Sequence, residues 1–402
     1  MAHDHHHDAP LDNFRLEPET WAKVRNVLAA TALVAWGASL GGYLQDHDQF
    51  TRSYLVAFLA TIFMALGGTF FVMVQHLTNS VWSVTVRRLM EALIMSLPIG
   101  ALLFIPIALN LHSLYEWSHP GFMQTSAVLK GKAGYLNENA FTIRAAIYFL
   151  IWTAISWRLW SLSRTQDVTK SASLNMSAAK VSAPGVFFLF ITATLAAFDW
   201  NMSLNPHWYS TIYGIYCLTG GAWGFFAILL WICLRLRSNG ILTQSINIEH
   251  YHDLAKWIFA LTAFWAYIGF SQYMLIWYAN LPEETIYYRV RAEGSWFILS
   301  LALPVIHFIF PFFLMIARPM KRNLNVLNFL CVYVLVVHYL DVYWMIMPNF
   351  QKHGIAFSWM DLSTLFAVLG TYGFFFWQKF KTAPIVPEGD PRLVKALRFH
   401  NV

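Results

Sequence analysis

Ten stretches of this sequence are each long and apolar enough to cross a lipid bilayer as a helix, which takes about 20 residues. They lie roughly at residues 24–44, 54–77, 89–112, 141–162, 184–204, 211–236, 252–279, 294–317, 324–345 and 357–380. Charged residues make up only 12% of the chain, about half the fraction that is usual in soluble domains. The runs are also too long to be strands of a membrane β-barrel. The sequence therefore predicts an all-α polytopic membrane protein with ten transmembrane helices.

The distribution of Lys and Arg between the loops predicts the orientation of these spans. Of the 27 Lys and Arg residues, 20 lie on the side of the N-terminus and 7 on the other side. Loops that stay in the cytoplasm carry an excess of these residues. We therefore expect a multi-pass protein of the bacterial cytoplasmic (inner) membrane, with both termini in the cytoplasm.

A weak internal repeat subdivides the predicted bundle. The matching features are Gly67-Gly68 with Gly220-Gly221, and Asp199 seven residues before Pro206 with Asp341 seven residues before Pro348. Two four-helix bundles in parallel repeat, flanked by two further helices, would account for both matches. The expected order is an N-terminal cytoplasmic tail (1–23), a flanking span (24–53), a first four-helix bundle (54–210), a second (211–356), a flanking span (357–380) and a C-terminal cytoplasmic tail (381–402).

No loop is long enough to form a soluble catalytic domain. The longest expected loops are 113–140 outside and 163–183 inside, so any chemistry takes place within the bundle or on a partner. The three cysteines lie in apolar runs without a CxxC or CxxCH motif, which excludes a covalent c-type haem and a four-cysteine iron–sulfur cluster. We assign no catalytic residue and no metal ligand. The His-rich segment 2–8 is expected to be a solvated tail, with adventitious metal binding as the alternative.

Ionisable residues within spans are costly and are candidates for function. An inner layer of them lies at the cytoplasmic ends of spans 2, 3 and 7, and its candidates for a proton path are His76, Arg88, Glu91 and Asp253. Arg88 and Glu91 are three residues apart and share a helix face, as do Asp253 and Lys256. Each pair is either an interfacial ion pair that anchors a helix end or part of a proton entry port.

An outer layer contains the remaining candidates for a proton path, Asp199, His307, His338 and Asp341. Asp199 lies in an apolar stretch, so it must change its ionisation or find a donor there. His338 and Asp341 are one turn apart and are expected to form a hydrogen-bonded pair, which suits proton transfer; the alternative is a polar clasp between packed helices. His307 lies between two prolines in a helix that we expect to be kinked. It either bridges the layers or caps the freed carbonyls.

The outer ends of the spans also carry groups suited to a flat quinone ring. The quinone-binding candidates are His112, His207 and Trp208, in a region crowded with other aromatic residues. Aromatic belts at the membrane interface and ordinary core packing are the alternative explanation for these rings.

Three stretches resemble a known family. The string Phe198 to Thr211 (FDWNMSLNPHWYST) resembles the span-5 signature of the NrfD/polysulfide-reductase-type membrane subunits, in particular the branch found in bacterial alternative complex III. Residues 86–93 (VRRLMEAL) look like the entry to span 3 of that branch. The tail, with Asp390-Pro391-Arg392-Leu393 and Phe399-His400-Asn401, resembles the end of the smaller, quinone-type membrane subunit of that complex.

The resemblance implies a quinol oxidoreductase of the respiratory chain that passes electrons to a cytochrome c or to a terminal oxidase. It implies as partners a larger paralogous membrane subunit, periplasmic multihaem cytochrome c subunits and an iron–sulfur protein, which would carry the haem c and the iron–sulfur clusters. Quinone or quinol is the ligand that this chain itself could bind. Membrane lipid is expected around the spans, and nucleic acid is not expected as a partner, because the net positive charge is spread over short loops.

Three functions are compatible with the sequence. We favour a membrane subunit that contributes proton conduction and structural support, with a relay of side chains and water from the inner layer through His307 to the outer layer; a sealed gap between the layers would exclude that relay. A stand-alone secondary transporter is the second hypothesis, although the prolines of spans 3 and 8 do not correspond under the repeat. A purely structural membrane scaffold is the third.

Overall fold

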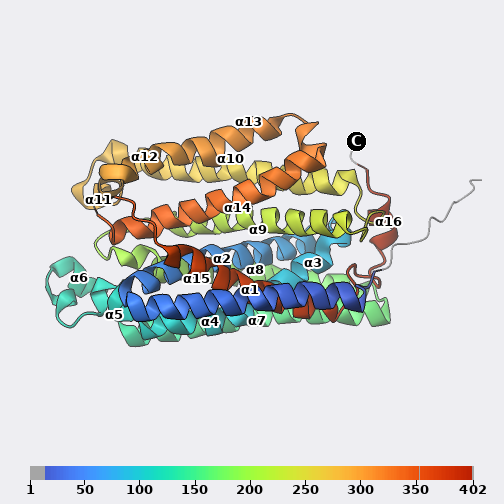
Figure 1. Cartoon of the computed structure of the whole chain (residues 1–402), viewed down its shortest axis with the longest axis horizontal. Coiled ribbons are helices and arrows are strands. Elements are labelled where there is room, and N and C mark those ends of the chain that lie inside the picture. Colours follow the sequence, from blue (N-terminus) through green and yellow to red (C-terminus); the bar gives the residue numbers. More distant parts are fainter. Residues whose placement is uncertain (1–13, 353, 401–402) are drawn as a thin grey trace, which may run out of the picture.

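The computed structural model describes residues 14–352 and 354–400. Within them the chain is helical and contains no strand, and ten helical segments are long and apolar enough to cross a membrane. These segments run alongside one another in a single elongated bundle (Figure 1). The predicted all-α, ten-span, multi-pass class is therefore confirmed, while the N-terminal His-rich segment lies outside the described residues.

The first five spans are α1 (Pro18–Gln45), α2 (His47–Leu77), α3 (Val84–Ile94) with α4 (Leu97–Leu109), α7 (Glu138–Thr169) and α8 (Ser173–Trp200). The last five are α9 (Tyr213–Ser238), α10 (Ile248–Ala279), α12 (Gly294–Leu303) continued by η4 (Pro304–Ile309) and α13 (Phe310–Ile316), α14 (Leu324–Ile346) and α15 (Trp359–Lys381). Short helices in the connections are α5 (Leu111–Leu114), α6 (Ala127–Lys132), α11 (Pro282–Arg291) and α16 (Leu393–Leu397).

The two ends of the bundle differ. One end carries α16, the start of α1 and the end of α15, and we call it the termini end. The other carries α6 and α11, and we call it the far end (Figure 1). The residues of the predicted inner layer lie toward the termini end, and those of the predicted outer layer lie toward the far end.

The predicted inner loop at 163–183 is wrong. Helix α7 continues to Thr169 and α8 begins at Ser173, which leaves a connection of only a few residues. The polar ends of both helices extend beyond the apolar runs, so hydropathy gives no sign of them. Lys170 ends α7 in the left-handed conformation, with φ of 52°.

Two spans are interrupted where prolines predict it. Span 3 divides into α3 and α4, with Pro98 in the first turn of α4, where a missing N–H costs no helical hydrogen bond. Span 8 passes through the π-helical segment η4, which begins at Pro304, and resumes as α13 just before Pro311. Because proline removes a helical donor and clashes with the preceding turn, both sites depart from a regular α-helix.

The centre of the molecule is the contact between α2 and α9. The apolar residues of α2 are buried along almost its whole length. A Cβ atom on Gly67 would lie 2.5 Å from Cα of Ala222, and one on Gly221 would collide with the carbonyl group of Phe63. Glycine at these positions therefore lets the two helix backbones approach closely, as small residues do in membrane helix packing.

Helices α1 and α15 pack against each other at one side of the bundle (Figure 1). The pair is joined by Trp36, whose Nε1–H donates to Thr371 over 2.9 Å, and by Trp377, whose Nε1–H donates to the carbonyl of Trp21 over 2.9 Å. Helix α15 also packs against α2. The first and last spans are thus neighbours, although they are far apart in the sequence.

Candidate functional site

The carboxylate of Asp341 is the centre of a buried polar cluster in the far half of the bundle. It lies on α14 and is 1% exposed. Tyr216 of α9 donates its hydroxyl to Oδ1 over 2.7 Å, and Trp265 of α10 donates Nε1–H to Oδ2 over 3.1 Å. Both donors are neutral, and no Lys or Arg among the described residues forms an ion pair with Asp341. An ionised Asp341 is therefore a buried charge without a counter-ion, which is costly in an apolar interior.

The ring of His307 is held between two indole rings. Its centroid lies 3.9 Å from that of Trp223 and 3.7 Å from that of Trp265, and both pairs are stacked. Neither ring nitrogen of His307 has a hydrogen-bond partner in the described part of the chain. The prediction that His307 caps carbonyls freed by the neighbouring prolines is therefore wrong. Stacking fixes the plane of the imidazole, and no hydrogen bond from a described residue determines which nitrogen carries the proton.

The predicted hydrogen bond between His338 and Asp341 is not formed. Nε2 of His338 instead lies 3.0 Å from the carbonyl oxygen of Ala60 on α2, and its Nδ1 has no partner within the described residues. A Cβ atom on Gly220 would lie 3.5 Å from Oδ2 of Asp341 and 3.7 Å from Nδ1 of His338. The carboxylate of Asp341 and the imidazole of His338 therefore both lie beside Gly220 of α9. Because Gly220 has no side chain, both groups fit there, but they do not bind each other.

The carboxylate of Asp199 accepts hydrogen bonds from neighbouring side chains, which is one of the two outcomes expected for it in an apolar stretch. Nε and Nη2 of Arg144 donate to its two oxygens over 2.9 and 2.8 Å, and the hydroxyl of Tyr148 donates to Oδ2 over 2.8 Å. The guanidinium also lies over the ring of Tyr135, 3.8 Å from its centroid. The negative charge of Asp199 is thus neutralised by Arg144, whereas Asp341 has no such counter-ion among the described residues. Sequence reasoning counted Arg144 only among the cations of the outer side and missed it as a partner; it lies on the first turns of α7.

At the termini end, the predicted pair of Arg88 and Glu91 belongs to a larger buried network. Nε of Arg88 lies 3.7 Å from Glu91, while its Nη2 binds Asp167 over 2.7 Å. Glu91 also forms an ion pair with Arg87, whose Nε lies 3.2 Å from Oε1, and Nη1 of Arg87 lies 2.7 Å from Asp390. The network joins α3, α7 and the C-terminal segment. Asp167 and Asp390 were not among the predicted site residues, because no spacing rule connects such distant positions. Arg87 was also missed, although it lies four residues before Glu91 and the spacing could have found it.

The remaining inner candidates lie around this network and beside it. Nε2 of His76 lies 3.9 Å from Oε1 of Glu91. Lys256 and Asp253 are in direct contact, as their spacing predicts, at the start of α10. The side chain of Lys256 is 46% exposed, so this pair sits at the surface of the bundle end, where an ion pair adds little stability.

Asp390 is held ionised by its neighbours. Burial opposes the charged form, but the hydrogen bonds from Arg392 and the positive charge of Arg87 outweigh it, so the pKa of Asp390 is lower than the ordinary value of an aspartate. Arg392 in turn donates to Asn79 over 2.6 Å and to Asn175 over 3.1 Å. The predicted C-terminal tail is therefore packed against the ends of several helices over its described length.

A cluster of three aromatic rings joins α2, α9 and α10. The ring of Phe71 lies 4.7 Å from that of Phe226 and 4.7 Å from that of Trp257, and Phe226 stacks on Trp257 at 5.7 Å. These residues stand on α2, α9 and α10 between the level of His307 and the termini end. The relay expected from His76 through His307 to Asp341 would have to pass these rings, and it stays a prediction.

The three quinone-binding candidates do not come together. The side chain of His112 is 61% exposed and lies 3.4 Å from Glu138. His207 is exposed in the connection after α8. Trp208 is buried and stacks on Tyr287 of α11, with ring centroids 4.1 Å apart. None of the three lines either of the two cavities described next.

A cavity of about 760 Å³ opens at the far end between α10, α11 and α12. Nearly half of its lining residues are aromatic, and they include Tyr216 and Trp265, the two donors to Asp341. The charged residues in the lining are Arg289 and Arg291; no aspartate or glutamate takes part. The cavity therefore extends from two arginines to the two side chains that donate hydrogen bonds to Asp341.

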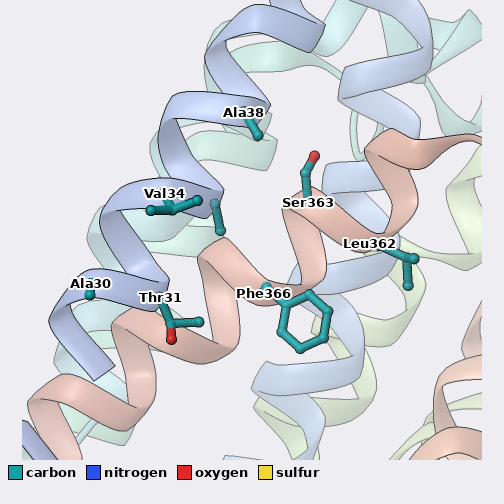
Figure 2. A pocket seen from close by; sticks show the side chains of 8 residues that line it. Ala30, Thr31, Val34, Ala38, Leu362, Ser363 and Phe366 are labelled. Atoms are coloured by element: carbon teal, nitrogen blue, oxygen red, sulfur yellow. The ribbon is translucent and has the colours of Figure 1, made fainter. Parts of the chain in front are cut away.

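Figure 2 shows a second hollow, of about 500 Å³, between α1 and α15. Its lining consists of Ala30, Thr31, Val34, Ala35, Ala38, Leu362, Ser363 and Phe366. None of these side chains is ionisable. Across the described residues, no group of three or more His, Cys, Asp or Glu side chains could hold a metal ion.

The sequence matches no family model, and no curated protein is significantly similar to it. What the fold and the composition define is a class, a multi-pass helical membrane protein with ionisable groups buried inside its bundle.

Proposed function

We propose that the chain is the smaller of two membrane subunits in a bacterial quinol-oxidising respiratory complex of the alternative complex III type. In this proposal the larger sister subunit oxidises the quinol, and multihaem cytochromes and an iron–sulfur protein carry the electrons to a cytochrome c or a terminal oxidase. This chain exchanges protons with the outer side of the membrane at Asp341 and gives structural support. The FDWNMSLNPHWYST string and the VRRLMEAL string support the assignment.

One observation carries the proton role. His307, His338 and Asp341 are buried in the far half of the bundle, the histidines have unpartnered ring nitrogens, and the carboxylate has no counter-ion among the described residues. Burial without a counter-ion disfavours the charged form of such a group, so in this proposal it changes protonation only when water or another charge reaches it during turnover. Asp199 differs, because Arg144 binds it through two hydrogen bonds.

The cavity provides the outer half of the route. Tyr216 and Trp265 line it on one side and bind Asp341 on the other. Of these two side chains only the hydroxyl of Tyr216 both donates and accepts, so a proton from the far end reaches the carboxylate through this phenol. Exchange with the termini end requires that the aromatic cluster at Phe71, Phe226 and Trp257 opens, and the π-helical segment beside His307 is the irregular element in which such a movement would begin.

The internal repeat fits the same proposal. Spans 2–5 form one four-helix bundle and spans 6–9 the other, in parallel orientation, with α1 and α15 as the flanking helices. The close contact of α2 with α9 at Gly67 and Gly221 supports this division, because these are the first spans of the two bundles and carry the matching glycine pairs. A transporter is less well supported. The break in span 8 has no counterpart in span 4, where α7 is one continuous helix.

The test is purification of the protein from its native membrane in mild detergent, followed by identification of the accompanying subunits and a haem stain. We expect multihaem cytochromes and an iron–sulfur protein to co-purify, with quinol oxidation activity in the same fraction. A chain that emerges alone, or as a homo-oligomer without haem, contradicts the assignment.

A structural scaffold is the second candidate, and the aromatic cluster at Phe71, Phe226 and Trp257 favours it. A scaffold needs no proton route, and the ion-paired network around Arg87 and Arg88 would then serve only to hold the helix ends together. If Asp199→Asn, Asp341→Asn and His338→Ala all leave turnover and proton translocation intact in the assembled complex, the scaffold function is the correct one.

A further inference from the structure

The cavity between α10, α11 and α12 has a charge pattern that the proton role does not use. Its charged lining residues are Arg289 and Arg291, both cationic. Arg291 is 1% exposed. Its guanidinium donates to the backbone carbonyls of Trp344, Tyr287 and Met345 over 3.2, 2.7 and 2.6 Å. These three bonds use three of the five N–H donors that a guanidinium has.

No carboxylate of the described residues neutralises these two arginines. Arg291 forms no ion pair with any described Asp or Glu, and its charge lies against the rings of Tyr287, at 3.5 Å, and Trp344, at 5.0 Å. Arg289 is exposed at the mouth of the cavity, and it too has no acidic partner in the described part of the chain. A buried cation without a counter-ion is costly, so the site favours an anion that enters from outside the chain.

The acidic residues nearby do not fill this role. Glu283 and Glu284 lie in the first turn of α11, whereas both arginines lie in its last turn. Glu293 precedes α12, and none of the three glutamates lines the cavity. The two arginines of the cavity are thus at the opposite end of α11 from Glu283 and Glu284.

The rest of the lining is mostly apolar or aromatic, with Gln272, Asn280, Thr285 and Ser300 as the polar exceptions. Phe270, Trp277, Phe297 and Leu301 line it and are 62%, 67%, 49% and 60% exposed. The lining extends along α10 from Asn280 at its far end to Trp265, which at 1.5 Å per residue is a length of about 20 Å. A polar, cationic mouth at the membrane interface that continues into an aromatic groove of this length matches an amphiphile with an anionic head group and a hydrocarbon chain.

We propose that this cavity binds an anionic phospholipid, with its phosphate at Arg289 and Arg291 and one acyl chain in the groove between α10 and α12. The proposal does not depend on the function proposed above. The chemistry of the head group is that of a phosphate anion, which arginine binds with two parallel hydrogen bonds. Docked in this way, the acyl chain would displace water beside Tyr216 and Trp265, so the lipid-filled cavity and the proton route proposed above are alternative states of this cavity.

The test uses the protein as extracted from its membrane, with any subunits that accompany it, after delipidation in detergent. Phosphatidylglycerol, phosphatidylcholine or inorganic phosphate is added, and binding is followed by native mass spectrometry and by the thermal unfolding midpoint. We expect phosphatidylglycerol to bind more tightly and to raise the midpoint more than phosphatidylcholine does. Inorganic phosphate should have little effect, because it lacks the chain.

Three variants separate the parts of the site. In Arg289→Gln the affinity for phosphatidylglycerol should fall about fivefold. This is the loss expected when one surface cation near an anionic lipid is removed. Lys130→Gln removes an exposed cation from α6 at the same end and should leave the affinity unchanged. Leu301→Trp narrows the groove from the lipid side without changing charge and should weaken the binding of both lipids.

The proposal is overturned if phosphatidylcholine binds as tightly as phosphatidylglycerol, or if Arg289→Gln and Lys130→Gln behave alike. Equal stabilisation by inorganic phosphate would show a free-anion site instead. A neutral ring compound such as a quinone that co-purifies with the protein, and that phosphatidylglycerol does not displace, would also overturn it.

Discussion

The hydroxyl of Tyr216 lies 2.7 Å from Oδ1 of Asp341, and this bond joins α9 to α14 within the buried polar cluster of the far half. Asp199 stands in the matching position of the predicted repeat and is bound by a guanidinium instead. The two buried aspartates therefore differ in charge balance, although their sequence contexts are similar. We expect them to respond differently to the same substitution.

Asp341→Asn should abolish proton translocation by the assembled complex while the protein stays folded. The amide keeps the size of the side chain but cannot titrate, and it turns one N–H donor toward Tyr216 or Trp265, at a cost of about 1–3 kcal/mol. Proton release measured in proteoliposomes and the unfolding midpoint check both parts. The matched control is Asp361→Asn, since Asp361 is also buried and accepts two hydrogen bonds, from Ser53 over 2.5 Å and from the backbone of Ser358 over 2.8 Å. Equal translocation by both variants would refute the role of Asp341.

Arg144→Gln should destabilise the protein by about 3–5 kcal/mol, because it leaves the buried carboxylate of Asp199 without its cation. The double variant Arg144→Gln/Asp199→Asn should recover much of this loss, since it removes the charge as well. Thermal unfolding of the four proteins in one detergent gives the coupling energy. Additive losses in the double variant would show that the pair contributes nothing beyond its separate members.

Gly221→Ala should separate α2 from α9 and lower stability by about 1–3 kcal/mol, as overpacking does. The new methyl group would collide with the carbonyl of Phe63 on the facing backbone, which cannot move away alone. Gly41→Ala on α1 is the control, because its Cβ would meet nothing within 4 Å. A Gly221→Ala protein as stable as the control would mean that the helices are not in backbone contact.

Asp390→Asn should cost about 3 kcal/mol and should remove an acid-sensitive part of the stability. The pKa of Asp390 is lowered in the folded protein, so its contribution is complete above the ordinary aspartate value of about 3.9 and is lost as the pH falls below it toward the folded-state pKa. Between pH 8 and 6 this group should therefore cause no change. The exposed neighbour Glu388 provides the control, as Glu388→Gln. If the wild-type and Asp390→Asn proteins lose stability in parallel below pH 4, Asp390 is not the responsible group.

Hydropathy is sufficient to predict the ten spans, because an apolar run of bilayer length has few alternatives. It fails at helix ends with polar sequence, as at the connection between Thr169 and Ser173. Prolines correctly mark the irregular region near Pro304, since the missing N–H is a local property. The subdivision into repeated bundles stays a prediction.

Side-chain partners are harder to predict than helices. His338 and Asp341 share a helix face, yet each binds a group on another helix, because tertiary neighbours offer better acceptors and donors than the adjacent turn. The partner of Asp199 was missed because Arg144 is 55 positions away in the sequence, and the partner of Arg87 lies beyond the tenth span. Pairings of this kind depend on the packed fold and leave no local pattern.

The bond between Arg87 and Asp390 also bears on how the protein is made. Arg87 enters the membrane region with span 3, while Asp390 follows span 10 and is synthesised after every membrane helix. Throughout insertion of the later spans, Arg87 therefore remains without this counter-charge at the end of the growing bundle. A nascent chain that stops just after span 10 would contain all ten spans and still lack the residue that joins the C-terminal segment to α3. The charge network at this end of the bundle is therefore completed only when the segment after span 10 has been made.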